Sequence, residues 1–298
     1  MKKVKLKFKI NLRNINEGIK YYLKGLYSKF DEDHIWIMSS GIAFDLLICL
    51  IPFNLILFSI FGLYLRSENT IDKIDTYLDN ILLIPFEIKT NIKQTILSKI
   101  GEISSYATLT VIIGITGLLW TASGLFSTIR SVLNKIYKIN IEVFFIWGRL
   151  RDIGMVFLIT ILFFVSFSMT SIFSIIQAID ERYLFNFLKI SSIINFVPII
   201  LGLLFSFLMF YLIFKILPHG KISNKVAIIS SVSSSILWEI LKFIFTFYLV
   251  KLSNFTAVYG TYAAIASVIL WIYYSSVTFV IGAELGQIYN EKKLLKSI

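Results

Sequence analysis

The sequence is poor in cysteine, histidine and charge. Its 298 residues include one cysteine and two histidines, and only 16% are charged. A single cysteine, Cys49, excludes an intrachain disulfide framework and a cysteine metal site. His34 and His219 stand apart from any group of ligands at metal-binding spacing, so we expect no metal. No glycine-rich phosphate loop and no Gly-x-Ser-x-Gly elbow occurs, so we also expect no catalytic residues, no cofactor and no enzymatic activity.

Long apolar runs dominate what is present. Hydrophobic residues make up 57% of the chain, and the mean hydropathy is +0.79. A run of about 20 apolar residues is needed to cross a bilayer as a helix. The pattern therefore predicts an all-α polytopic membrane protein with six transmembrane helices. The expected spans cover residues 35–65, 107–126, 153–176, 193–214, 226–250 and 258–281.

Three polar segments complete the expected organisation. Residues 1–34 form a basic arm that is expected to lie as an amphipathic helix on anionic lipid headgroups, or alternatively to be a solvated arm. Residues 66–106 are expected to form a small extracytoplasmic cap of two short amphipathic helices, with Pro85 between them. Residues 35–283 then form the membrane domain, and residues 284–298 form a polar tail.

The distribution of basic residues predicts the orientation. The net charge is +11, but the basic residues lie in the arm and in loops, so no nucleic-acid partner is expected. Of the 29 Lys and Arg, 20 lie in segments that face one side, 8 face the other, and Lys242 lies in a span. Short membrane-protein segments rich in Lys and Arg usually lie on the cytoplasmic side. We therefore expect a bacterial plasma-membrane protein with cytoplasmic termini, with membrane lipids as partners and homo-oligomerisation left open.

Ionisable residues inside the expected spans are the first candidate site. Asp45 lies in the first span, and Glu239 and Lys242 lie three residues apart in the fifth. Charges inside a membrane usually face a bundle interior or a water-filled cavity. One hypothesis is that the three side chains line a polar cavity for an ion, a proton or a lipid headgroup. The alternative is a buried salt bridge that only orders helix packing.

Prolines and small residues predict breaks and helix contacts. Pro52 is the expected break in the first span, and Asn195 with Pro198 predicts a kink or a break in the fourth. Small residues recur at spacings of three or four, which favours close helix packing. They are Gly114, Gly117, Ser231, Ser234, Ser235, Gly260, Ala263, Ala264 and Ser267. Near the end of the second span, Trp120 favours the interface and Ser123 with Gly124 favours helix packing.

Several motifs together resemble the YihY/virulence factor BrkB family. They occupy residues 43–52, 119–126, 134–137, 215–218, 237–239, 259–264, 270–273 and 282–285. Their characteristic positions are Pro52, Trp120, Ser123, Gly124, Asn134, Pro218, Trp238, Tyr259, Gly260, Trp271 and Glu284. The resemblance implies a six-span bacterial inner-membrane protein of undefined biochemical role, often labelled a ribonuclease by mistake. Asp45 departs from the family, which usually has an aromatic or small residue there.

Three classes of function remain open. A transporter or lipid-handling protein with a polar intramembrane cavity is the leading hypothesis. A non-catalytic envelope scaffold is the second, and it needs no cavity. A membrane-bound ribonuclease is the third, but the residues offer neither a carboxylate cluster nor a histidine pair for it. Glu284 is interpreted as the solvated end of the sixth span, with a functional role as the alternative.

Overall fold

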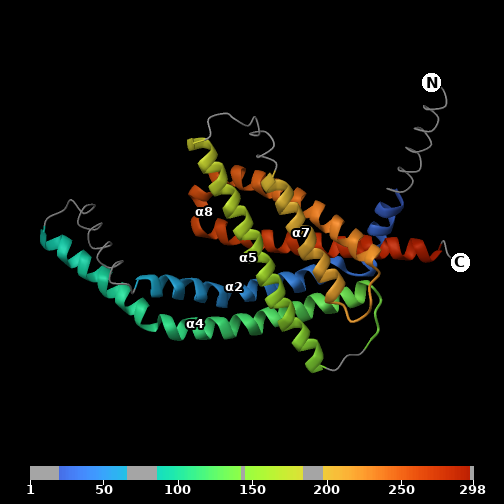
Figure 1. The fold of residues 1–298 in the computed structure, drawn as a ribbon, viewed down its shortest axis with the longest axis horizontal. Helices are drawn as coiled ribbons and strands as arrows, with labels where there is room; N and C mark the ends of the chain where they lie inside the picture. The colour runs from blue at the N-terminus through green and yellow to red at the C-terminus, as the bar shows by residue number, and fades with distance from the viewer. Residues whose placement is uncertain (1–19, 66–85, 142–144, 184–196, 296–298) are drawn as a thin grey trace, which may run out of the picture. The chain divides into compact units, whose positions relative to one another are not determined.

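The computed structural model describes residues 20–65, 86–141, 145–183 and 197–295. Within these ranges the regular secondary structure is entirely helical, which confirms the expected all-α class for the described part of the chain (Figure 1). A helical segment covers residues 20–32. The longer helices are α2 (Ile35–Leu65), α4 (Phe86–Ile136), α5 (Phe145–Tyr183), α7 (Val197–Ile216) and α8 (Asn224–Leu295).

Four stretches of these helices are long and apolar enough to cross a membrane. They are Ile35–Ile60, Tyr106–Ile136, Asn224–Leu249 and Tyr262–Leu295, and a shorter apolar helix covers Ile200–Ile216. Many large apolar side chains on these stretches point outward, including Phe58 and Phe243. An apolar exterior on a helical bundle suits contact with lipid. The four stretches coincide with the first, second, fifth and sixth expected spans.

The described residues divide into two compact units. Unit 1 lies within residues 1–44 and 123–298, and unit 2 lies within residues 45–122. The expected division into arm, membrane domain and tail stays a prediction. The fold of each unit is given separately below.

Helix α4 differs from the expected cap. The sequence predicted a separate short helix over the first residues of what is one continuous helix from Phe86 to Ile136. No proline follows Pro85 until Pro198, so nothing removes a backbone donor from this helix. The other predicted cap helix falls outside the described residues.

Helix α7 begins where a break was predicted. Pro198 is the second residue of this helix. The first turn lacks intrahelical partners for its N–H groups, so proline is well tolerated there. Pro198 thus lies in the first turn of the fourth apolar helix and does not interrupt it. Asn195 lies outside the described residues.

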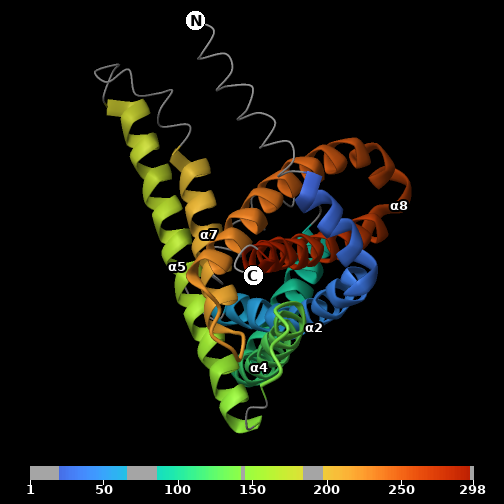
Figure 2. The ribbon, with the colours of Figure 1, turned by 90° about the vertical axis from the view of Figure 1, so that its right-hand side faces the viewer.

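Helix α8 contains both the fifth and the sixth expected span. It was predicted as two helices with a loop between them and a polar tail, but its 72 residues are continuously helical through Leu295. Figure 2 shows the ribbon of α8 running out, bending and returning. Residues 224–249 are called the first arm below, and residues 262–295 the second arm.

Small residues hold the two arms together at one end. A Cβ atom on Gly282 would lie 1.8 Å from Oγ of Ser234, and one on Gly286 would lie 1.9 Å from Oγ of Ser230. The backbone of the first arm is close as well, since the Ser230 carbonyl oxygen would lie 3.0 Å from the same Cβ atom on Gly282. Membrane helices associate through such close approach because lipid supplies no hydrophobic drive between them. We call these four residues the glycine contact.

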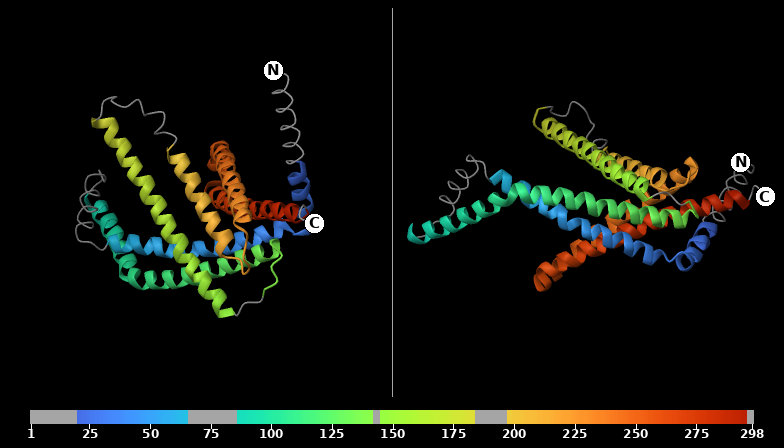
Figure 3. Two further views of the ribbon diagram at one scale, coloured as in Figure 1. Left: turned by 45° about the vertical axis from the view of Figure 1, so that its right-hand side comes forward. Right: turned by 90° about the horizontal axis from the view of Figure 1, so that it is seen from below.

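Aromatic rings join α7 to both arms of α8. Phe214 stacks on Phe279 with 4.8 Å between ring centroids, and Phe210 meets both Phe279 and Trp238 at 6.2 Å. The rings of Trp238 and Trp271 then connect the first arm to the second at 5.3 Å. Helix α5 packs along the other side of α7 (Figure 3). The order of packing in unit 1 is therefore α5, α7 and α8.

Unit 2 contains the pairing of α2 with α4. A Cβ atom on Gly114 would lie 2.7 Å from the side chain of Ile56 and 3.3 Å from the carbonyl oxygen of Pro52. Gly117 approaches the Pro52 ring at 3.3 Å. The prediction that these glycines mark a helix contact is confirmed. Pro52 lies inside α2, which continues through it to Leu65.

Candidate functional site

Polar side chains gather at one end of unit 1. At this end α4 finishes, α5 and α8 begin, α7 finishes, and the last turns of α8 return. Two residues after the end of α4, Lys138 adopts the left-handed conformation at φ 55°, and His34 adopts it before α2 at φ 54°. The N–H of Ile139 bonds back to the Asn134 carbonyl at 2.8 Å, which caps the helix. We call this region the polar end.

Glu284 is the central residue of the polar end. Its side chain is fully buried at 0% exposure, so its interpretation as a solvated helix end is wrong. Neither carboxylate oxygen makes a well-formed hydrogen bond to a residue that the structure describes, although the Asp33 carboxyl group lies nearby. The charges of Asp33, Lys29 and Glu291 act on it. Burying a carboxylate without a hydrogen-bond donor costs free energy, and binding a proton or a cation would lower that cost.

Other polar groups on neighbouring helices surround this carboxylate. Tyr137 at the end of α4 and Ser230 in the first arm share a hydrogen bond of 2.9 Å. Burial raises the pKa of the Tyr137 hydroxyl, so this group stays protonated. Gln287, one turn after Glu284, is also buried and bonds to Glu291 at 3.3 Å. The interior here is polar, although it lies between apolar helices.

The helical segment 20–32 contributes a buried lysine. Nζ of Lys29 lies 3.0 Å from Asp33 and 3.5 Å from Glu291, and Glu291 also pairs with Lys138 at 2.8 Å. Burial by itself lowers the pKa of the Lys29 amino group. The hydrogen bond to Asp33 and the carboxylates of α8 outweigh burial, so the pKa lies above its usual value. The ion pair of Lys29 with Glu291 ties the segment to the second arm, while its contact with lipid stays a prediction.

A second polar group lies at the start of α5. It consists of Arg130, Arg149, Arg151 and Asp152, and we call it the arginine cluster. Arg130 of α4 forms an ion pair with the fully buried Asp152 and donates to the Gly148 carbonyl at 3.0 Å. Arg149 donates to Oγ of Ser123 at 3.1 Å. Ser123 is thereby explained as a hydrogen-bond acceptor. A Cβ atom on Gly124 would meet no described atom within 4 Å, so close helix packing at Gly124 was predicted wrongly.

Asn134 fastens the connection between α7 and α8. Its Oδ1 accepts the N–H of His219 at 3.0 Å, and its Nδ2 lies 3.3 Å from Nδ1 of the same histidine. Arg151 donates to the carbonyl of Pro218 at 3.2 Å. Burial lowers the pKa of the His219 ring, and the charges of Arg151 and Arg130 lower it further, so the ring is neutral near pH 7. The motif positions Asn134 and Pro218 thus act together.

The predicted intramembrane charges are only partly brought together. Glu239 and Lys242 form an ion pair of 2.7 Å across one turn of the first arm, and both side chains remain partly exposed. Asp45 belongs to unit 2, so its approach to this pair stays a prediction. The ion pair agrees with the packing alternative as well as with the cavity hypothesis.

The remaining motif positions divide into three kinds. Trp120 is 74% exposed, as expected for a side chain that faces the membrane. Trp238 and Trp271 belong to the aromatic packing of α8. Tyr259 and Gly260 lie within α8, at positions whose side-chain surroundings fall outside the description.

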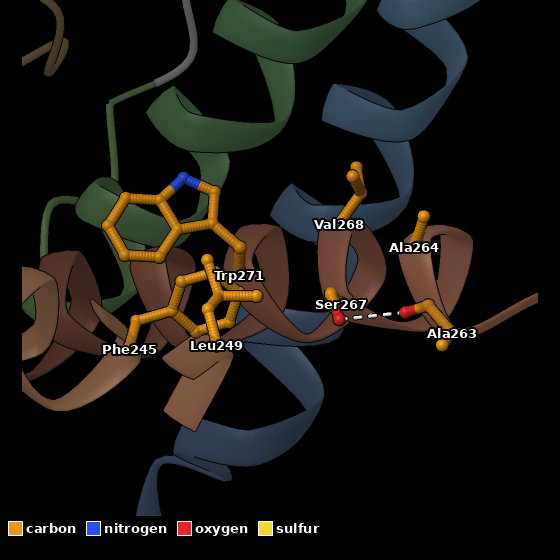
Figure 4. A pocket seen from close by; sticks show the side chains of 7 residues that line it. All are labelled: Phe245, Leu249, Ala263, Ala264, Ser267, Val268 and Trp271. Carbon is orange, nitrogen blue, oxygen red and sulfur yellow. Dashed lines mark hydrogen bonds between the residues drawn. The ribbon is translucent and has the colours of Figure 1, made fainter. Parts of the chain in front are cut away.

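A groove lies between the arms of α8 at the end far from the glycine contact. Its volume is about 420 Å³. Figure 4 shows Trp271 and Phe245 on one side of it, with Ser267 bonded to the Ala263 carbonyl at 2.7 Å. The lining residues are Phe245, Leu249, Ala263, Ala264, Ser267, Val268 and Trp271. We call it the aromatic groove.

Sequence reasoning missed the arginine cluster, and of the glycine contact it predicted Ser234 but not Gly282, Gly286 or Ser230. The spacing Gly282-x-x-x-Gly286 is a known signal for close helix pairing, and it would have predicted the glycine contact. No comparable signal existed for Arg130 and Asp152, which are separated by a helix end and a loop. Among the described residues, no group of three His, Cys, Asp or Glu is placed to hold a metal ion.

These apolar helices and their outward-facing side chains define an integral membrane protein, and comparison with known proteins identifies its family. The profile of the virulence factor BrkB family matches residues 26–297. The chain belongs to this family. No solved structure matches it.

Individual relatives are similar over most of this chain. A putative ribonuclease-like protein, YfkH, of Bacillus subtilis is 24% identical over 284 residues, which cover 92% of this chain and 97% of the relative. A UPF0761 membrane protein of Cronobacter sakazakii is 25% identical over 279 residues, or 92% and 90%. A UPF0761 membrane protein of Chlorobium phaeobacteroides is 24% identical over 287 residues. That alignment covers 94% of this chain and 60% of that longer relative.

Proposed function

We propose that this chain is a transporter or lipid-handling protein that moves a proton, an ion or a lipid headgroup past Glu284. The observation that carries the proposal is the complete burial of this carboxylate, whose oxygens make no well-formed hydrogen bond to a described residue. An ionisable group inside a membrane helix costs about 3 kcal/mol at the helix centre, and such groups mark ion and substrate pathways.

The surroundings of Glu284 support this role. Lys29, Asp33 and Glu291 bring charge to it, and Tyr137 with Ser230 provides hydroxyl groups on two other helix segments. Groups that exchange protons or hold polar headgroups need such neighbours on several helices, so that a movement of one helix changes the site. The small residues of the two arms permit that movement without loss of a bulky contact.

The proposed topology has six spans with both termini in the cytoplasm of a bacterial cell. It rests on the basic residues, 20 of which fall on the side of the termini and 8 on the other. In this arrangement the polar end, with Glu284, lies at the cytoplasmic face. A proton or headgroup would meet Glu284 from the cytoplasm.

Reconstitution tests the proposal directly. The full chain is placed in vesicles that contain a pH-sensitive dye, with fluorescent phosphatidylglycerol in the membrane, and proton flux and lipid translocation are both recorded. We expect wild type to raise one of these rates at least tenfold above empty vesicles. Glu284→Gln should abolish the increase, because the amide cannot take up or release a proton.

The matched control is Glu32→Gln, which removes a carboxylate from the exposed face of the segment 20–32. It should leave both rates unchanged. Wild-type rates equal to those of empty vesicles would contradict movement of a proton or a lipid headgroup, and a Glu284→Gln variant as active as wild type would contradict the role of Glu284.

A non-catalytic envelope scaffold is the second candidate. The glycine contact favours it, because arms that touch at their backbones leave no passage between them at that level. In the same experiment a scaffold would show no flux, while Glu284→Gln would still lower thermal stability. A ribonuclease is a third alternative, and it rests on the printed name of the Bacillus subtilis relative alone.

A further inference from the structure

Arg151 presents two unused donors inside the protein. Its Nη1 is occupied by the Pro218 carbonyl. Nε and Nη2 are buried and find no acceptor among the described residues. These two N–H groups lie on the same edge of the guanidinium plane, spaced to meet two oxygens of one phosphate or carboxylate. The free edge is therefore complementary to an oxyanion.

His219 supplies a third donor beside Arg151. Because Oδ1 of Asn134 accepts the backbone N–H of His219, its Nδ2 faces Nδ1 of the ring as a donor. Nδ1 then acts as the acceptor, and the ring proton resides on Nε2. Nε2 is buried and makes no well-formed hydrogen bond to a described residue, although the carbonyl of Ile141 lies nearby.

The charge of Arg151 is not balanced by the carboxylate of Asp152. Arg130, Arg149 and Arg151 all act on Asp152, whose carboxylate is already paired with Arg130. Arg151 forms no ion pair with any residue that the structure describes, because the only carboxylate acting on it is already paired with Arg130. Buried charges are normally paired, because an unpaired charge away from water is costly. A bound anion would balance the charge of Arg151.

We propose that the free edge of Arg151 and Nε2 of His219 bind a phosphate group. Two adjacent donors on Arg151, with a third on the neighbouring His219, suit the several oxygens of a phosphate better than the two oxygens of a carboxylate. The donors are buried in this conformation, so the anion enters when residues 217–223 move away from Asn134. The phosphate belongs either to a soluble molecule or to a lipid headgroup, since both offer the same oxygens.

This site is separate from Glu284, and binding is measurable without any transport. The full chain is purified in a neutral, phosphate-free detergent, and inorganic phosphate is titrated by calorimetry. Arg151→Gln should weaken binding at least about tenfold, the size expected for a lost charge-assisted hydrogen bond. Arg151→Lys keeps the charge but loses the paired donors, so it should also weaken binding.

The matched control is Lys221→Gln, which removes one positive charge from an exposed position in the same connection. It should leave the affinity within twofold of wild type. Equal loss in Lys221→Gln and Arg151→Gln would overturn the proposal in favour of non-specific charge. Wild-type affinity in Arg151→Lys would overturn it as well, and this variant decides the question if Arg151→Gln fails to fold.

A second arm of the experiment identifies the source of the phosphate. The same titration is repeated in nanodiscs of phosphatidylcholine alone and in nanodiscs that also contain phosphatidic acid. Loss of inorganic phosphate binding only with phosphatidic acid assigns the site to a lipid headgroup. Unchanged binding in both assigns it to a soluble phosphate. Absence of phosphate binding by wild type in detergent and in both nanodiscs would refute the site.

Discussion

The two ends of the α8 hairpin are built on opposite principles. At the polar end Gly282 and Gly286 let the arms touch Ser230 and Ser234 almost at the backbone. At the other end Trp271 and large neighbours such as Phe245 hold the arms apart and leave a groove of about 420 Å³. The same pair of helices is therefore tightly packed at one end and open at the other.

This difference shows how side-chain volume sets helix separation in a membrane. Lipid tails are as apolar as leucine, so the arms gain little from burying apolar surface and gain mainly from contact. Glycine permits many short contacts, whereas aromatic rings give a few pairwise contacts of about 1 kcal/mol each.

The largest effect is expected from filling the glycine contact. Gly282→Leu places a side chain where even one carbon would lie 1.8 Å from Ser234, so the arms must separate. Overpacking of this kind should cost about 3 kcal/mol. Thermal unfolding in detergent should show a large fall in Tm. Gly154→Leu, at an exposed site with no described atom within 4 Å, is the control and should leave Tm nearly unchanged.

A smaller loss is expected at the open end. Trp271→Ala removes the ring pairs with Trp238 and Phe245, whose centroids lie at 5.3 and 4.8 Å. Two such pairs contribute about 2 kcal/mol together. Tm should fall by a few degrees, and Trp147→Ala, on an exposed part of α5, should change it less. An equal fall in both variants would show that these rings do not hold the arms.

The smallest effect has the opposite sign. Gly124→Ala adds a methyl group in open space within α4. Because glycine in a helix interior costs about 0.5–1 kcal/mol relative to alanine, Tm should rise slightly. The comparison with Gly282 would lose its basis if Gly124→Ala destabilised the protein as much as the change at Gly282.

Particular residues show where sequence reasoning succeeded. The positions of Gly114 and Gly117 predicted a helix contact because small residues at spacings of three or four have few other uses in apolar helices. The pair Glu239 and Lys242 was predicted to meet, since side chains three residues apart share a helix face. Each of these predictions depends on local spacing alone.

Other residues could not be interpreted from the sequence. Glu284 was read as solvated because it follows the last apolar run, yet the second arm continues to Leu295 and buries it. Arg130 and Asp152 are 22 positions apart and meet only because α5 packs back near the end of α4. Their pairing depends on the path of the chain between them, which no spacing rule supplies.

By itself the sequence determined that the chain forms long apolar helices, because backbone amides in lipid must bond to one another and only a helix does this within one segment. It also determined where small residues permit close contact. Only the tertiary structure decided which polar side chains lie inside. Burial depends on which helices meet and at what separation, and those contacts join residues far apart in the chain.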